Sequence, residues 1–418
     1  DPREVLKFIS GFNFNESDNR KDFFQQYLNP DHTPTGADST QQQNTASNNS
    51  NISLRINYDK LLKGNKLSLN VGANANRYAN HNVLNTVFMK KPEQVFVKNE
   101  LLSNDFVFHQ DIYGFRAALR YDIVKDFYIN AGVQTENTQT HLDIIDNSNR
   151  YANNYWSPLP FFTLMKKWKN EVSITASYKR TIQRPRLNEL NPGLDYADPY
   201  NTRSGNPYLQ PYYADNFELI VGKWNKLYYI NGSVGYNALD DIYSFIRTLN
   251  ADGTTFSTWQ NISGRKEYEA NAWGGYTVNK KLKLNLSLGY SYNVYSLRDR
   301  TVNRYRNGGS FFSTLNGSYL FNTLLNGNAS FTFNRFANPQ GTVRNTLSMN
   351  IGVQQKFFKK KMILALSVID PLRQQQNKIF TYAGNFNLES YSTTKTKNFR
   401  IALSYIFSKK VKKKILPK

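Results

Sequence analysis

Apolar and polar side chains alternate with a period of two residues through most of this chain. Over residues 282–292, Leu and Tyr occupy every even position, while Lys, Asn, Ser and Gly occupy the odd positions. Because successive side chains of an extended strand point to opposite faces, this spacing collects the apolar side chains on one face. The same alternation recurs over residues 172–179, 347–354 and 399–407. The pattern predicts an all-β fold made of antiparallel strands.

The polar face of these strands consists mostly of Asn, Ser, Thr, Gly and Gln. A soluble antiparallel sheet exposes its polar face to bulk water and usually carries many charges there. Small neutral polar side chains suit the wall of a water-filled interior, with the apolar face in contact with lipid. Aromatic residues make up 15% of the chain and could form the girdles at the membrane interfaces. We therefore predict a transmembrane antiparallel β-barrel, with a soluble sandwich or propeller as the alternative.

The connections between the predicted strands alternate between short and long. Segmentation gives about sixteen strands, an even number as in bacterial outer-membrane barrels, which have short periplasmic turns and long external loops. The predicted short turns lie near residues 62–65, 122–126, 168–170, 224–226, 279–280, 321–322 and 358–360. The predicted long loops lie near residues 15–50, 80–102, 145–155, 184–211, 249–253, 297–308, 336–341 and 371–390. The polar, low-complexity run 41–50 is predicted to be a mobile loop tip.

The chain is strongly basic, with 53 Lys and Arg residues against 31 Asp and Glu residues and a net charge of +22. Such a charge is also typical of proteins that bind nucleic acids. Here, however, lysines gather at the predicted short turns, as at 280–283 and 359–361, and in the tail 409–414. A ring of lysines at one membrane edge can contact lipid headgroups while the side-chain stems lie along apolar surface. We predict lipid as the partner and no nucleic acid, and the arginines of the long loops could contact lipopolysaccharide phosphates.

No motif in the sequence predicts catalysis, a metal or a cofactor. The chain has no Cys, and its four histidines, His32, His81, His109 and His141, are not spaced as metal ligands. No glycine-rich phosphate loop or nucleophile elbow is present. No stretch reaches the ~18 apolar residues that a membrane-spanning helix needs. We expect a protein that is not an enzyme.

Residues 184–211 form the most distinctive predicted loop. Five prolines in this span restrict the backbone, and the Tyr and Asn residues between them offer both apolar and hydrogen-bonding surface. Rigid loops on a scaffold often carry binding residues. The predicted substrate contacts are Arg184, Arg186, Tyr196, Tyr200, Arg203, Asn206 and Tyr208. The alternative is that the loop packs under the other loops or on the barrel wall.

This loop and its flanking strands resemble the barrel of TonB-dependent outer-membrane receptors of the Bacteroidetes type. The resemblance is carried by the segments 177–180, 184–185, 190–192, 198–200, 205–207, 209–211 and 217–219. The strand 114–121 is similar to a segment of the family, although Asp122 stands where Glu is usual. Residues 366–372 and 403–407 resemble the closing strands of the family. The resemblance implies a barrel of about 22 strands around a plugged lumen.

The resemblance also implies an outer-membrane location and the import of a bulky nutrient, driven by TonB acting through a plug. Neither a plug nor a TonB box is recognisable, so we expect the C-terminal part of a longer receptor, with a barrel over residues 1–408 and a basic periplasmic tail over 409–418. A surface lipoprotein lid over the loops would be a further partner. The sequence does not identify the ligand, which could be a siderophore, a glycan, a peptide or a vitamin. Two alternatives remain, a passive porin of about sixteen strands and a scaffold or adhesin barrel in an outer-membrane assembly.

Overall fold

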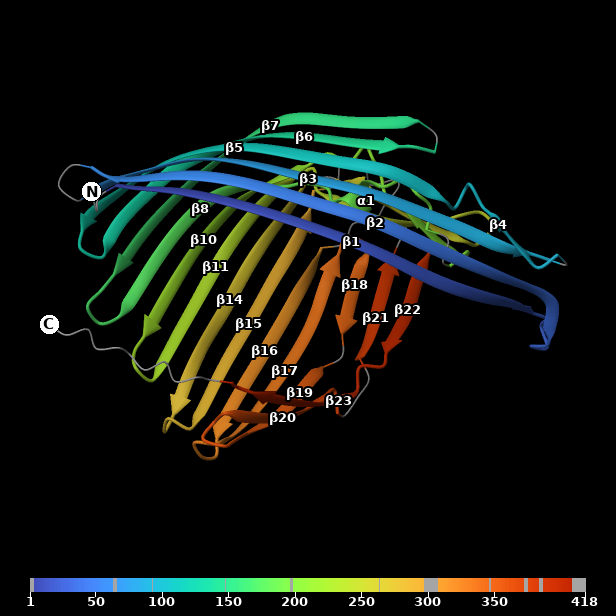
Figure 1. Ribbon diagram of the computed structural model, residues 1–418. Coiled ribbons are helices and arrows are strands. Elements are labelled where there is room, and N and C mark those ends of the chain that lie inside the picture. Colours follow the sequence, from blue (N-terminus) through green and yellow to red (C-terminus); the bar gives the residue numbers. More distant parts are fainter. Residues whose placement is uncertain are drawn as a thin grey trace.

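The computed structural model is dominated by β-strands (Figure 1). It describes residues 4–62, 66–91, 93–146, 148–195, 198–262, 264–296, 307–345, 347–371, 375–382 and 386–407. Within these ranges there are twenty-three strands and one short helix, α1 (Leu187–Leu190). The predicted all-β fold is confirmed. No helix in this part of the chain is long and apolar enough to cross a membrane.

Sixteen of the described strands form the wall, each antiparallel to its neighbour and following it in chain order. This agrees with the predicted number. They are β1 (Glu4–Leu28), β2 (Pro34–Leu61), β3 (Leu67–Lys90), β5 (Asn104–Val124), β6 (Phe127–Ile144), β7 (Asn149–Lys167), β8 (Val172–Gln183), β10 (Tyr212–Trp224), β11 (Tyr228–Asp240), β14 (Arg265–Val278), β15 (Leu282–Tyr295), β16 (Gly308–Leu320), β17 (Leu325–Asn338), β19 (Ser348–Phe357), β20 (Met362–Ile369) and β23 (Asn398–Tyr405).

The other described strands belong to the long connections. They are β4 (Val95–Lys98), β9 (Asn201–Ser204), β12 (Tyr243–Leu249), β13 (Thr255–Asn261), β18 (Gly341–Asn345), β21 (Gln375–Tyr382) and β22 (Asn387–Thr394). β4 pairs with the end of β3, and β18, β21 and β22 extend the wall beyond β17. β12, β13 and β9 form a separate three-stranded sheet, in which β9 and β13 run parallel.

The predicted short turns join consecutive wall strands at one end of the sheet (Figure 1). In the β14–β15 turn, Asn279 and Lys280 both have positive φ, 50° and 57°. Two consecutive residues in this conformation match the twist of the paired strands in a hairpin. Residues 63–65 of the predicted β2–β3 turn lie outside the described residues, as do 297–306 of one long loop and the tail 409–418.

The predicted loop over residues 15–50 was wrong. β1 and β2 run 25 and 28 residues, more than twice the ~9–11 residues that cross a bilayer, and meet in a tight turn at residues 29–33. Residues 41–50, predicted to be a mobile loop tip, lie in β2 and pair with β1 and β3. Where a strand projects beyond lipid, both faces meet water and the apolar period disappears, while the backbone ladder continues. For the same reason β3 and β7 extend into the predicted loops 80–102 and 145–155.

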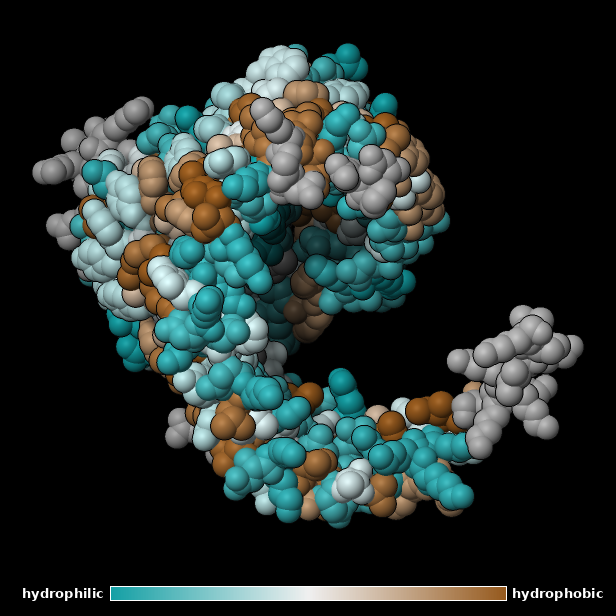
Figure 2. Space-filling model, turned by 90° about the vertical axis from the view of Figure 1, so that its left-hand side faces the viewer, coloured by the Kyte–Doolittle hydropathy of each residue, from teal (hydrophilic) through white to brown (hydrophobic). Residues whose placement is uncertain are grey.

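Alternate residues of the wall strands face opposite sides. On β10, Phe217 and Leu219 leave 47% and 42% of their surface exposed on the outside, although both are large apolar residues. The intervening Glu218 faces the interior with the other polar side chains. Figure 2 looks toward the short-turn end, where the wall curves around a hollow with mostly hydrophilic residues. The sheet is open on one side because, in the described residues, β1 pairs only with β2 and β23 only with β20. The larger barrel of about 22 strands stays a prediction.

Candidate ligand-binding site in the barrel lumen

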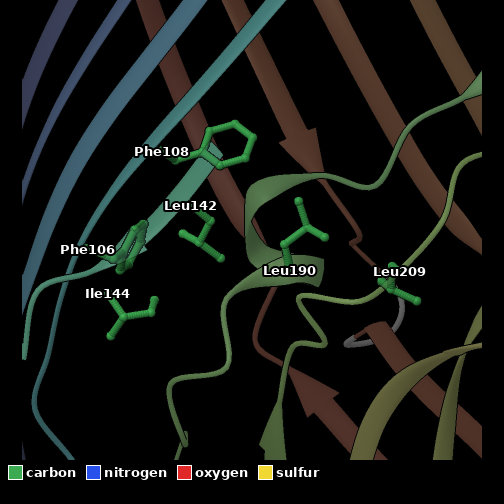
Figure 3. Close-up of a cluster of buried hydrophobic side chains, with 6 residues drawn as sticks. All are labelled: Phe106, Phe108, Leu142, Ile144, Leu190 and Leu209. Carbon is green, nitrogen blue, oxygen red and sulfur yellow. The ribbon is translucent and has the colours of Figure 1, made fainter. Parts of the chain in front are cut away.

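The connection 184–211 folds into the lumen and packs on the inner wall, as the alternative interpretation of this loop expected. Leu190 of α1 and Leu209 are 6% and 2% exposed. They join Phe106 and Phe108 of β5 in one apolar cluster (Figure 3), which also includes Leu142 and Ile144 of β6. Burying these side chains removes apolar surface from water and holds the loop against β5 and β6.

Arg184 fixes the first residue of this connection to the wall. Its guanidinium forms an ion pair with the Glu136 carboxylate of β6, and its Nε donates a hydrogen bond to Thr138 Oγ1 at 2.9 Å. The two charged side chains are 16% and 11% exposed. Gln134 Nε2 donates to the same carboxylate at 2.6 Å. Arg184 therefore positions the loop, because its guanidinium is held to β6 by a buried ion pair and a hydrogen bond.

Hydrogen bonds within the loop join residues 189–191 to residues 205–206, and one more ties Asn191 to β5. The Gly205 N–H donates to the Asn191 carbonyl at 2.8 Å, and Asn104 Nδ2 of β5 donates to Asn191 Oδ1 at 2.7 Å. A Cβ atom on Gly205 would lie 2.5 Å from the Asn191 carbonyl oxygen, which is closer than packing allows. The loop is thus a compact body that requires glycine at this position.

β12 and β13 pack against the same loop, which contributes β9 to their three-stranded sheet. Asn206 Nδ2 donates to the Trp259 carbonyl of β13 at 3.0 Å, and the Tyr243 hydroxyl of β12 donates to the Arg184 carbonyl at 2.9 Å. Burial raises the pKa of the Tyr243 hydroxyl, which keeps this donor protonated. The loop 184–211 and the sheet β9–β12–β13 therefore form one inner assembly.

The upper cavity, as we name it, lies between this assembly and the inner faces of β2, β3 and β5. Its volume is about 830 Å³. Asn80 Nδ2 donates to Asn49 Oδ1 at 2.6 Å and to Ser47 Oγ at 3.1 Å, and the Tyr78 hydroxyl donates to Asn49 Oδ1 at 2.9 Å. Asn80 is 4% exposed, and its Oδ1 accepts no hydrogen bond within the described ranges. Phe108 lies beside Tyr78, with 6.0 Å between ring centroids. The wall thus offers neutral amide and hydroxyl groups next to aromatic surface.

The predicted contact residues are distributed around the inner assembly. Arg184 and Arg186 line the upper cavity, and Tyr208 lines a second cavity of about 300 Å³ with Tyr151. The rings of Tyr208 and Tyr151 meet edge to face at 5.4 Å. Arg203 pairs with Asp195 in the loop at 2.6 Å.

The other three predicted contacts are Tyr200, Asn206 and Tyr196. The Tyr200 side chain is 59% exposed and its carbonyl accepts a hydrogen bond from the Thr255 N–H. Asn206 holds the sheet, as described above. Tyr196 lies outside the described residues.

Residues 1–405 match the model of the outer membrane protein beta-barrel family. The chain belongs to this family. Its place is therefore the outer membrane, and the outward apolar faces of the wall strands meet lipid. The predicted location and the predicted transmembrane barrel are both confirmed.

Solved structures of outer-membrane receptors have the same fold as this barrel. The copper transporter OprC aligns with a TM-score of 0.60 at 10% identity, over 97% of this chain and 69% of OprC. The unliganded ferric citrate transporter FecA aligns with a TM-score of 0.62 at 10% identity, over 97% of this chain and 62% of FecA. The ferric yersiniabactin uptake receptor FyuA of Yersinia pestis aligns at 0.53 and 11% identity, over 97% of this chain and 71% of FyuA. The chain thus spans about two thirds of the length of these receptors. Curated proteins gave no match.

Sequence reasoning missed most of the residues that line the upper cavity of this outer-membrane barrel. Ser47 and Asn49 fall in the run that was predicted to be a loop tip, and Asn80 in a predicted loop. A usable signal was present, because Asn74, Asn76, Asn80 and Asn82 stand at even positions along β3. A polar residue at every second position of a barrel strand indicates the face that meets the lumen.

A lower cavity of about 690 Å³ lies on the inner wall toward the short turns, and its charged lining residues are mainly basic. Lys7, Arg55, Arg116 and Arg120 line it together with Asp59. The guanidinium of Arg116 lies 4.2 Å from the ring centroid of Phe161, and that of Arg120 lies 3.8 Å from the ring centroid of Tyr128. Stacking fixes both cations along the wall. In the described part of the chain, no group of three His, Cys, Asp or Glu residues is placed to hold a metal ion.

Proposed function

We propose that this chain forms the barrel of a TonB-dependent transporter that imports a bulky nutrient, which binds in the upper cavity. The observation that carries the proposal is the inner assembly itself. A proline-rich loop, fixed to the wall by Arg184 and Glu136, forms one side of an 830 Å³ cavity whose other side is the barrel wall. Such a preformed, partly apolar cavity with a few convergent polar groups suits a small-molecule site.

The ligand class follows from the lining. Asn49, Asn80 and the Tyr78 hydroxyl offer neutral donors and acceptors, the Tyr78 ring and Ile112 offer apolar surface, and Arg186 adds a cation at the loop edge. This combination suits a ligand rich in hydroxyl or amide groups with an apolar side. Arg184 acts as a positioning residue in this scheme. Tyr196, Tyr200, Arg203, Asn206 and Tyr208 stay predicted contacts on the same loop.

The predicted partners fit the two ends of this barrel. The basic lower cavity could receive a plug, through which TonB would act. The extended hairpin β1–β2 and the long loops would meet lipopolysaccharide and a surface lipoprotein lid. OprC and FecA are described as transporters, which favours transport over catalysis for this fold.

An uptake assay tests the proposal. Cells that carry the full receptor gene, with and without TonB, would be given ferric siderophores, oligosaccharides, peptides and cobalamin. We expect uptake of one class only, abolished without TonB. Asn80→Ala should lower that uptake by roughly tenfold through the loss of buried hydrogen bonds, whereas Tyr391→Ala, on the exposed hairpin β21–β22, should not change it.

The two alternatives predict different results. A porin would let small solutes enter at equal rates with and without TonB and would conduct ions in planar bilayers. A scaffold or adhesin barrel would show no uptake defect on deletion and would copurify with a stable protein partner. Either result would overturn the transport proposal.

A further inference from the structure

A groove lies on the lipid-facing side of β11, β14 and β15, close to their short turns. Its volume is about 500 Å³, and its lining is almost entirely apolar. Ile230, Gly274 and Leu286 stand in one cross-strand row, with the glycine between the two larger side chains. Ala272 continues the floor one outward position along β14. A Cβ on Gly274 would lie 2.8 Å from the Tyr229 carbonyl oxygen, so the backbones approach closely there and the floor stays low.

Aromatic residues flank the end of the groove nearest the turns. Tyr228, Tyr276 and Leu284 form the next cross-strand row in that direction. Tyr276 is 49% exposed on the outer face. Tyrosines at this depth belong to the girdle at the membrane interface, where the ring lies against lipid and the hydroxyl faces the headgroups. The groove therefore runs from the hydrocarbon layer to the periplasmic interface.

Three lysines stand at this end of the groove. Lys226 lies in the β10–β11 turn, and Lys280 and Lys281 lie in the β14–β15 turn, all with exposed side chains. The two turns adjoin, because the Thr277 N–H donates to the Leu227 carbonyl at 2.8 Å. An apolar channel thus leads directly to a cluster of cations.

We propose that this groove binds one anionic phospholipid of the periplasmic leaflet. One acyl chain would lie over Gly274 and Ala272 between Ile230 and Leu286, and the phosphate would meet the three lysines. This face is in contact with lipid in any case, since it belongs to an outer-membrane barrel. The groove and the cations together select a particular lipid from that surrounding layer, because acyl burial and headgroup attraction act on the same molecule. The inference is independent of the transported nutrient.

Native mass spectrometry of the purified chain from detergent micelles tests the groove. Phosphatidylglycerol would be added, and the lipid retained at rising collision energy would be counted. We expect one retained molecule in the parent chain. Ala272→Phe fills the groove with an apolar side chain and should abolish this retention. Ala270→Phe is the matched control, because Ala270 faces the same side one outward position farther along β14 and does not line the groove. Equal retention by the two variants would overturn the proposal.

The same measurement tests the cation cluster. The triple change Lys226→Gln, Lys280→Gln and Lys281→Gln should weaken phosphatidylglycerol binding by on the order of a hundredfold, at roughly fivefold for each charge. Neutralising Lys359, Lys360 and Lys361 in the β19–β20 turn is the control and should leave the retained molecule in place. Zwitterionic phosphatidylethanolamine should be lost at lower collision energy. Equal retention of both lipids, or no effect of the first triple change, would refute a site for an anionic lipid. Unboiled gel migration checks that every variant is folded.

Discussion

Arg184 holds the inner assembly to the wall through a buried ion pair with Glu136. Changing Arg184 to Ala would leave the Glu136 carboxylate buried without its cation, a loss on the order of 3–5 kcal/mol. The wall should stay folded, because its backbone ladders do not involve this side chain, and the strain should be relieved by release of the loop 184–211. Hydrogen exchange should therefore speed up in this loop and hardly change in β10.

Arg203→Ala is the matched control for this prediction. Arg203 also forms an ion pair in the loop, with Asp195, but its side chain is 64% exposed, and exposed pairs contribute ~0–1 kcal/mol. Exchange in the loop should then stay close to that of the parent chain. Similar acceleration in the two variants would show that burial of the Arg184 pair has no special role.

At the scale of elements, the same turn is built twice, at the β1–β2 tip and between β12 and β13. Residues 29–33 and 250–254 both read Asn-X-Asp-X-Thr. In each, the Asn amide nitrogen donates to the Thr hydroxyl at 2.9 Å. The fourth residue has positive φ, 65° at His32 and 84° at Gly253. A side chain is strained in this conformation and glycine is not.

The two turns therefore predict opposite outcomes for reciprocal changes. His32→Gly should stabilise the β1–β2 turn by about 1 kcal/mol, and Gly253→His should destabilise the β12–β13 turn by a similar amount. Hydrogen exchange of the Thr33 and Thr254 amides reports each turn separately. Shifts of the same sign in both turns would contradict the assignment of strain to the fourth residue.

The aspartate of each turn gives a prediction about pH. Hydrogen bonds from the Thr33 hydroxyl and N–H hold the pKa of Asp31 below its ordinary value of 3.8, and Thr254 does the same for Asp252. Because the folded turn favours the carboxylate, its contribution is complete above pH 3.8 and is lost as the pH falls through the lowered pKa. In NMR, the Thr33 amide shift should follow the titration of the Asp31 carboxyl, with a midpoint below 3.8. When the hydroxyl is removed in Thr33→Val, this midpoint should move back toward 3.8. A midpoint at or above 3.8 in the parent chain would refute the interpretation.

At the scale of the whole molecule, the wall could be predicted and the inner assembly could not. The two-residue period and the turn residues depend on local chemistry, so the strand number and the β14–β15 turn at Asn279 followed from the sequence. The first part of β2, from residue 34 at the hairpin tip to residue 50, has no apolar period because water meets both of its faces. The sequence pattern therefore predicted a loop there. The parallel pairing of β9 with β13 joins residues more than fifty positions apart, such as Asn201 and Thr255, and no local pattern records it.

In the outer membrane, the apolar face of each wall strand must meet lipid and the opposite face must meet the lumen. Leu219 and Ile220 are neighbours on β10, about halfway between its ends, and point to lipid and lumen respectively. Leu219→Arg should destabilise the barrel by roughly 2–4 kcal/mol, since the charge would lie near the middle of the bilayer. Ile220→Arg should cost much less, because the same charge would meet the aqueous lumen. The temperature at which the fast-migrating folded band disappears from unboiled gels measures both. Equal losses would mean that the apolar stripe of β10 does not face hydrocarbon.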